Sequence, residues 1–194
     1  MRRPAILSVW AGCWLLVSTP ATRAEDPAAD LLTHVFMDAC VPHIGDSTGV
    51  RQWAAQHQLG QIKDPSALAL FAGAGDQGAA WAIPAAEGSF ALSLRGLTGG
   101  CAVWARTADP AAVLVDFKKI VDGVKRPGIE LSVDEDKVTQ TQYGRAHALV
   151  YNVTARDAPR SIEFTLLTVE RPGGPFQASI QVAAAGPHAA QRKK

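Results

Sequence analysis

The sequence lacks an excess of charge of either sign. Its 194 residues include 19 lysines and arginines against 18 aspartates and glutamates, which gives a formal net charge of +1. The basic run Arg192-Lys193-Lys194 at the C-terminus is too short to form a binding patch. This balance excludes a protein that binds nucleic acid through general charge attraction.

Long apolar runs are also missing, except at the N-terminus. Arg2 and Arg3 precede an uncharged apolar run over residues 5–18, and Thr22-Arg23-Ala24 ends in a small residue. This layout is typical of a secretory signal peptide, cleaved after Ala24. The run is shorter than the about 20 residues of a membrane anchor, so we expect no transmembrane segment after removal of residues 1–24. That removal takes three of the 19 basic residues and none of the 18 acids, leaving a formal charge of −2.

Ala11-Gly12-Cys13 allows a second interpretation, because small residues before a cysteine can mark a bacterial lipoprotein. Trp10 is bulky where such a signal has a leucine-like residue, and the apolar run continues past Cys13 to Val17. We therefore expect a cleaved signal rather than a lipid anchor at Cys13, and a periplasmic or secreted protein.

Cysteine is scarce, and only Cys40 and Cys101 follow the predicted signal. In an exported protein two cysteines are usually paired, so we predict a Cys40–Cys101 disulfide. The spacing of Cys40 and His43 leaves two alternatives open, a zinc site or a nucleophile with its base. The remaining histidines show no ligand-like spacing; they are His34, His57, His147 and His188.

Motifs that carry catalysis or cofactors are missing as well. The chain has no G-x-S-x-G element of a serine hydrolase. Gly73, Gly75 and Gly78 match the dinucleotide pattern G-x-G-x-x-G, but they follow a predicted helix instead of a strand. The acids of residues 134–136 lack the frame of a calcium loop, so we predict a solvated turn there. We expect no cofactor and no metal.

Three tryptophans remain after the signal, Trp53, Trp81 and Trp104. Core packing is the more common role for such residues, and lining a groove for a sugar or a peptide is the alternative. Trp104 and Trp81 are the candidate binding residues, with Trp104 first because it lies opposite Cys101 and Val103 in the alternation of its strand.

Apolar periodicity predicts an α+β fold, with N-terminal helices followed by an antiparallel sheet made of a hairpin, a long helix and a three-strand meander. Ser47 is the predicted cap of the second helix. The pattern predicts a single domain over residues 25–186 and a flexible tail over residues 187–194. The expected helices span residues 30–40, 47–58, 64–71 and 109–123; the expected strands include a hairpin over residues 89–106, a strand at 81–84, and strands within 129–133, 139–155, 162–169 and 176–183.

Three features of the chain can be compared with known families: the spacing of Phe36, Cys40 and His43, the Trp-Ala-Ile-Pro stretch at Trp81, and the Gly-Cys-Ala-Val stretch around Cys101 followed by a helix. Together they resemble a family of small exported proteobacterial proteins of unknown function. Some members of that family look like lipoproteins. The resemblance spans about residues 30–185 and implies export, but it brings no activity, substrate or catalytic residue.

Two functions follow as hypotheses. The first is a non-enzymatic binding module of the cell envelope, whose partner is an unknown envelope protein or glycan. The second is a hydrolase or redox protein that uses Cys40 and His43. Enzymatic activity is left undecided by the sequence, and the first hypothesis is favoured.

Overall fold

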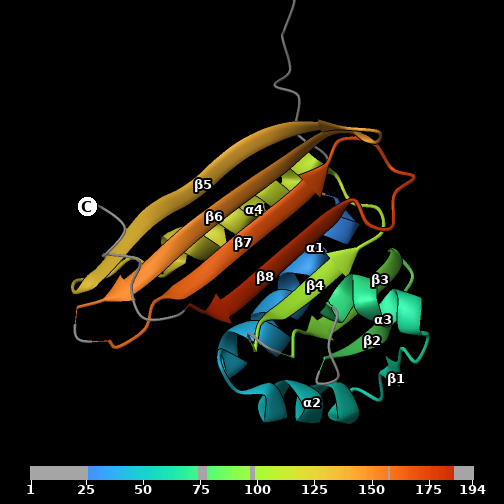
Figure 1. Ribbon diagram of the computed structural model, residues 1–194, viewed down its shortest axis with the longest axis horizontal. Coiled ribbons are helices and arrows are strands. Elements are labelled where there is room, and N and C mark those ends of the chain that lie inside the picture. The colour runs from blue at the N-terminus through green and yellow to red at the C-terminus, as the bar shows by residue number, and fades with distance from the viewer. Residues whose placement is uncertain (1–25, 74–77, 97–98, 157, 186–194) are drawn as a thin grey trace, which may run out of the picture.

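A computed structural model describes residues 26–73, 78–96, 99–156 and 158–185 (Figure 1). The predicted signal, Cys13, Gly75 and the predicted tail lie outside these residues. The described chain forms one α+β domain with four α-helices and an eight-stranded antiparallel sheet, which confirms the fold class. No helix in the described ranges is long and apolar enough to cross a membrane.

Each of the three α-helices in the N-terminal part begins with a capping carboxylate. Asp26 accepts a hydrogen bond from Ala28 N at the start of the first helix, and Asp64 accepts one from Ala67 N at the start of the third. Asp46, and not the predicted Ser47, caps the second helix through the N–H groups of Thr48 and Gly49. The elements of this part are α1 (Pro27–Val35), a π-helical turn (Phe36–Cys40), a 3₁₀ turn (Val41–His43), α2 (Ser47–Gln56), the short strand β1 (Gly60–Gln61) and α3 (Pro65–Ala72).

Two meanders joined by one helix make up the rest of the chain. In the sheet the strands follow the order β1-β2-β3-β4-β8-β7-β6-β5, so the second meander folds back until its last strand pairs with β4. Helix α4 connects the meanders, begins at its predicted position and is capped by Asp109. The elements are β2 (Ala79–Ala85), β3 (Gly88–Leu94), β4 (Cys101–Ala105), α4 (Pro110–Gly123), β5 (Ile129–Thr141), β6 (Gly144–Ala155), β7 (Ile162–Val169) and β8 (Ala178–Ala184).

The arrangement of strands differs from the prediction in two places. The predicted hairpin is confirmed as β3 and β4, but β2 pairs with β3 and extends it to a meander of three strands. The meander after α4 has four strands instead of three. The predicted turn at residues 134–136 is wrong, because β5 runs through these acids with a β-bulge between Val133 and Glu135. An edge strand with both faces exposed tolerates charged side chains that a central strand would exclude.

Gly144 is the first residue of β6, directly after the turn from β5. This turn divides the segment of residues 139–155, which the sequence predicts as one strand. The Gly144 φ of +89° is a conformation that favours glycine. A Cβ at this position would also lie 3.0 Å from the Glu170 carboxylate. Glycine therefore allows the tight entry into β6 beside Glu170.

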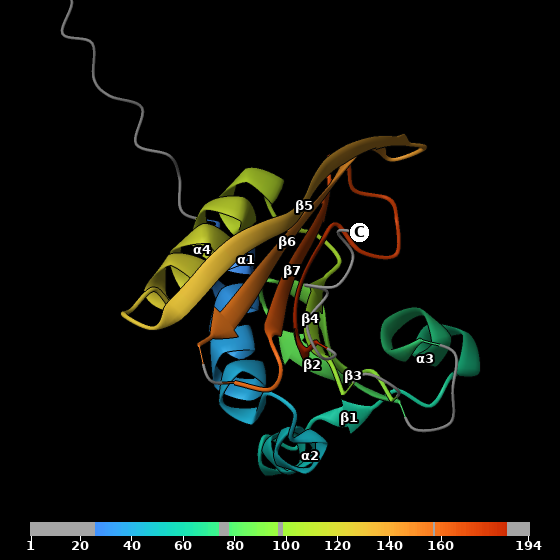
Figure 2. The ribbon, with the colours of Figure 1, turned by 60° about the vertical axis from the view of Figure 1, so that its left-hand side comes forward.

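Helices cover the two faces of the sheet unequally. Figure 2 shows α1 and α4 on one side of the sheet and α3 on the other, over β2 and β3. The main core lies under α1 and α4, and its largest fully buried side chains include Leu32, Phe36, Phe117, Phe164 and Leu166. A small second cluster lies under α3 and is built on Trp104. The opposite face of β5 to β8 carries no helix in the described chain.

Candidate functional site

The two predicted cysteine partners meet beneath the helices. Cys40 ends the π-helical turn after α1, Cys101 begins β4, and their Sγ atoms are 1.95 Å apart with the Cα atoms at 5.4 Å. The structure therefore confirms the expected pairing. Their exposures are 0% and 2%, so neither sulfur presents a surface to solvent.

His43 lies in different surroundings from the disulfide. It belongs to the 3₁₀ turn and is half-buried, with its ring against the first turn of α2, where a Cβ at Gly49 would collide with it. A reactive cysteine needs a thiolate, which Cys40 lacks in this bonded state. In the described part of the chain, no group of three or more histidine, cysteine or acidic side chains is placed to hold a metal ion.

The two candidate tryptophans lie on opposite faces of the sheet. Trp104 is 5% exposed on the α3 side of the sheet, where its indole N–H donates to the Ser93 hydroxyl at 2.8 Å. Phe71 and Phe176 pack edge-on against it at 5.6 and 4.7 Å between ring centroids. Trp81 is 7% exposed in the main core on the opposite face. These candidate binding residues therefore do not line a common groove.

Trp104 does border a small cavity. The cavity has a volume of about 160 Å³ and lies between α3, the sheet and the loop that contains Phe176. Its aromatic walls pack against one another, and the indole N–H already has a partner. This arrangement is that of a satellite core beneath α3.

A larger groove opens where α4 begins, on the helix-covered face of β5, β6 and β7. Its volume is about 430 Å³, and the first turn of α4 forms one wall. The groove combines apolar and charged side chains within one concavity, a combination typical of binding sites. The lining side chains beyond the first turn of α4 are Leu114, Val138, Arg145, His147, Thr168 and Glu170.

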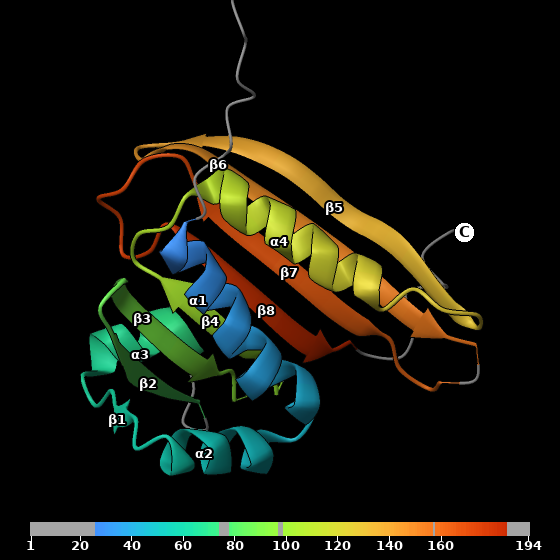
Figure 3. The same ribbon diagram turned by 180° about the vertical axis from the view of Figure 1, so that it is seen from behind.

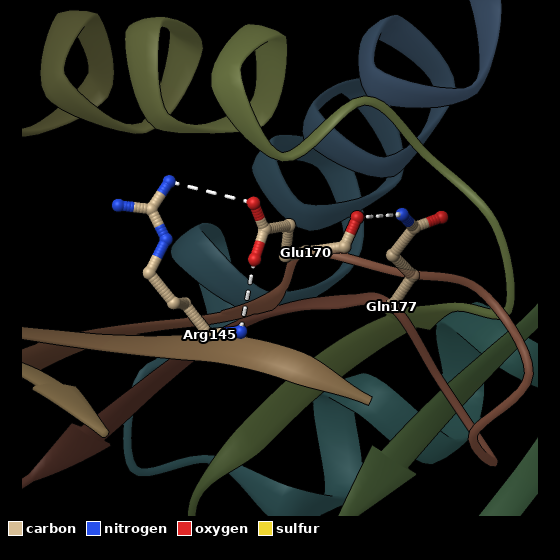
Figure 4. A network of polar contacts seen from close by, with 3 residues as sticks. All are labelled: Arg145, Glu170 and Gln177. Atoms are coloured by element: carbon tan, nitrogen blue, oxygen red, sulfur yellow. Dashed lines mark hydrogen bonds and ion pairs between the residues drawn. The ribbon is translucent and has the colours of Figure 1, made fainter. Parts of the chain in front are cut away.

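A polar network fixes the position of this groove (Figure 4). The Glu170 carboxylate accepts hydrogen bonds from Arg145 N at 3.1 Å and from Arg145 Nη2 at 3.4 Å. The Glu170 carbonyl accepts a hydrogen bond from Gln177 Nε2 at 3.2 Å, and Gln177 Oε1 accepts one from Ala108 N, just before α4. Because Gln177 is buried, its amide ties the strand ends firmly to the start of the helix.

Asp26 adds a second connection to the same helix end. One carboxylate oxygen caps α1 through Ala28 N, and the other accepts a hydrogen bond from Asp109 N, at the start of α4. A single aspartate therefore holds the N-termini of α1 and α4 together. The groove wall formed by α4 is positioned from both the sheet and α1.

Hydrogen bonding lowers the pKa of Glu170 below its ordinary value of 4.5, first through the backbone N–H of Arg145 and then through its guanidinium. We expect the Glu170 carboxyl to titrate below 4.5 in an NMR pH titration. The variant Arg145→Ala keeps the backbone donor, so it should move the midpoint upward only in part. A wild-type midpoint at or above 4.5 would contradict the network.

The same shift has a consequence for stability. Since the folded-state pKa is lowered, the contribution of Glu170 is complete above the unfolded-state value and is lost as the pH falls through the folded-state value. The difference in unfolding free energy between wild type and Glu170→Gln should therefore shrink on acidification through that range.

His147 faces the groove from β6 and is paired with an acid. Its Nε2 lies 2.8 Å from Asp136 Oδ1 on β5, and the direction of the hydrogen bond depends on the histidine tautomer. Thr168 of β7 and Val138 of β5 are its cross-strand neighbours. The groove floor is thus assembled from three adjacent strands.

The outer side of the groove is unusually apolar for an exposed strand. Val133 and Val138 have exposures of 53% and 57%, the two largest among the exposed large hydrophobic side chains of the described residues. Both lie on the helix-facing side of β5, opposite Tyr151 and His147 of β6. Figure 3 shows α4 lying along the sheet, with β5 at the outer edge.

Sequence reasoning missed the groove because its side chains come from separate segments. Arg145, His147 and Glu170 belong to no motif, and the only signal for Gln177 was a polar residue within a predicted strand. Comparison of the chain with protein-family models, curated proteins and solved structures finds no match.

Proposed function

We propose that this chain is an exported, non-enzymatic binding module, and that it binds its partner at the groove and along the adjoining face of β5. The signal pattern of residues 1–24 supports export, as does the resemblance to small exported proteobacterial proteins. A disulfide in a mature domain fits an oxidising compartment such as the periplasm or the exterior.

The exposed apolar side chains of β5 are the main support for the proposal. The two most exposed large hydrophobic side chains of the described residues, Val133 and Val138, share one face of one edge strand. Val138 also lines the groove, where Arg145 and Glu170 are held in place by hydrogen bonds. Exposed apolar side chains grouped beside fixed polar groups are typical of an interaction surface.

The disulfide weighs against the alternative use of Cys40 with His43. Joined to Cys101 and fully buried, Cys40 offers no nucleophile. The binding hypothesis needs no free thiol, and its candidate surface lies on β5, β6, β7 and α4. The disulfide therefore favours the binding module over a hydrolase or redox protein that uses Cys40.

Site-specific photo-crosslinking in the producing cells tests the proposal. A benzoylphenylalanine replaces Val138 in one variant and Leu70 in a control variant, since Leu70 is 40% exposed on α3. We expect a discrete covalent adduct from the Val138 position only, in the periplasmic fraction or the medium and on a chain without residues 1–24. Equal adducts from both positions, or an unprocessed chain in the cytoplasm, would contradict the proposal.

A further inference from the structure

The outer edge of β5 is available for further pairing. β5 ends the strand order and pairs with β6 on one side, and among the described residues no strand pairs with its other side. It is 13 residues long, whereas β1 at the opposite end of the sheet has only two residues. A sheet edge carries N–H and C=O groups that another extended chain can bind.

The two faces of β5 differ in chemistry. Leu131, Val133 and Val138 lie on the helix-facing side together with Asp136, because their partners in β6 face α4. The Asp136 carboxylate on this side already contacts His147. Glu130, Glu135 and Lys137 lie on the open side, opposite Thr154, Val150 and Ala148. A strand added at this edge would continue both faces, since side chains alternate along it.

The charge of β5 favours some binding partners at this edge over others. β5 carries four acidic residues and one lysine. Pairing with a second copy would place two strands side by side that each carry four acids and one lysine, a net charge of −3 on each. Like charges on opposing strands are destabilising, so a basic partner is favoured over a second copy of this chain.

We propose, resting on the binding function proposed above, that the partner contributes an extended polypeptide segment in which apolar and basic residues alternate. This segment pairs with β5 as a ninth strand of the eight-stranded sheet. Its apolar side chains lie beside Val133 and Val138, and its basic side chains lie beside Glu130 and Glu135. Backbone hydrogen bonds supply affinity, and the two faces supply specificity.

Amide hydrogen exchange on the oxidised protein tests this pairing directly. The probe is a nine-residue peptide of alternating valine and lysine, compared with a valine–glutamate peptide and with the valine–lysine peptide N-methylated on alternate residues. We expect saturating valine–lysine peptide to slow the exchange of amides on the outer edge of β5 by about tenfold or more. Neither comparison peptide should do so.

Charge variants test the assignment of the open face. Glu130→Lys combined with Glu135→Lys should weaken binding of the valine–lysine peptide by about tenfold and shift preference toward the valine–glutamate peptide. Glu87→Lys, at an exposed acid in the turn between β2 and β3, is the matched control and should bind as wild type does. Unchanged affinity in the double variant would overturn the charge assignment.

Three other results would overturn the proposal. In the first, the β5 amides exchange equally with and without peptide. In the second, they are protected without peptide when the protein dimerises, so a second copy occupies the edge. In the third, they are protected without peptide and lose this protection when residues 187–194 are deleted, so the chain's own C-terminal segment occupies the edge. An adduct from the Val138 photo-crosslinker together with unprotected β5 amides would refute strand addition and leave the binding function standing. Protected amides without any cellular adduct would refute the binding function instead.

Discussion

Reduction of the Cys40–Cys101 disulfide is expected to lower the free energy of unfolding by about 4 kcal/mol. The two cysteines are 61 residues apart, and closing a loop of that length removes much of the conformational entropy of the unfolded chain. The loop contains α2, α3, β2 and β3, so the bond constrains more than a third of the described fold. Urea unfolding with and without reductant measures the effect.

The double variant Cys40→Ala and Cys101→Ala is the control for this experiment. Its unfolding midpoint should not respond to the reductant and should be near that of the reduced wild type or lower, because both positions are buried. Identical midpoints for wild type with and without reductant would show that the bond does not form in solution.

Phe117→Ala is expected to destabilise the fold by about 3–5 kcal/mol, the range for truncating a fully buried phenylalanine. Phe117 is 0% exposed on α4, and its ring centroid lies 6.0 Å from that of Tyr151 on β6. It is therefore one of the contacts that hold α4 against the sheet. Calorimetry or urea unfolding measures the loss.

Val115→Ala on the same helix is the matched control. Val115 is 43% exposed, so its truncation should change the free energy of unfolding by at most about 0.5 kcal/mol. Similar losses for the two variants would mean that α4 does not pack through the face that carries Phe117. The groove would then lack its helical wall.

Local sequence signals predicted much of the fold. Asp64 and Asp109, each followed by a proline, located the starts of α3 and α4, because a carboxylate cap and a proline at the first helical position act within a few residues. Period-2 alternation predicted β3 and β4. Cysteine scarcity in a chain with a signal pattern predicted the disulfide.

Features that depend on distant neighbours could not be predicted in this way. Continuation of β5 through Glu135 is stabilised by pairing with β6, and nothing local distinguishes these acids from a turn. The groove requires the order of strands in the sheet, which brings Arg145 and Glu170 together across 25 residues. Gln177 bonds Ala108 N across 69 residues for the same reason.

Crosslinking in the cell at Val138, set against Leu70, is the most direct measurement of whether the groove and β5 form the binding surface. Our account predicts one specific adduct at Val138, none at Leu70, and a processed, oxidised chain in the fraction outside the cytoplasm. An adduct of equal yield at Leu70, or no adduct at Val138 in cells that export the protein, would contradict it.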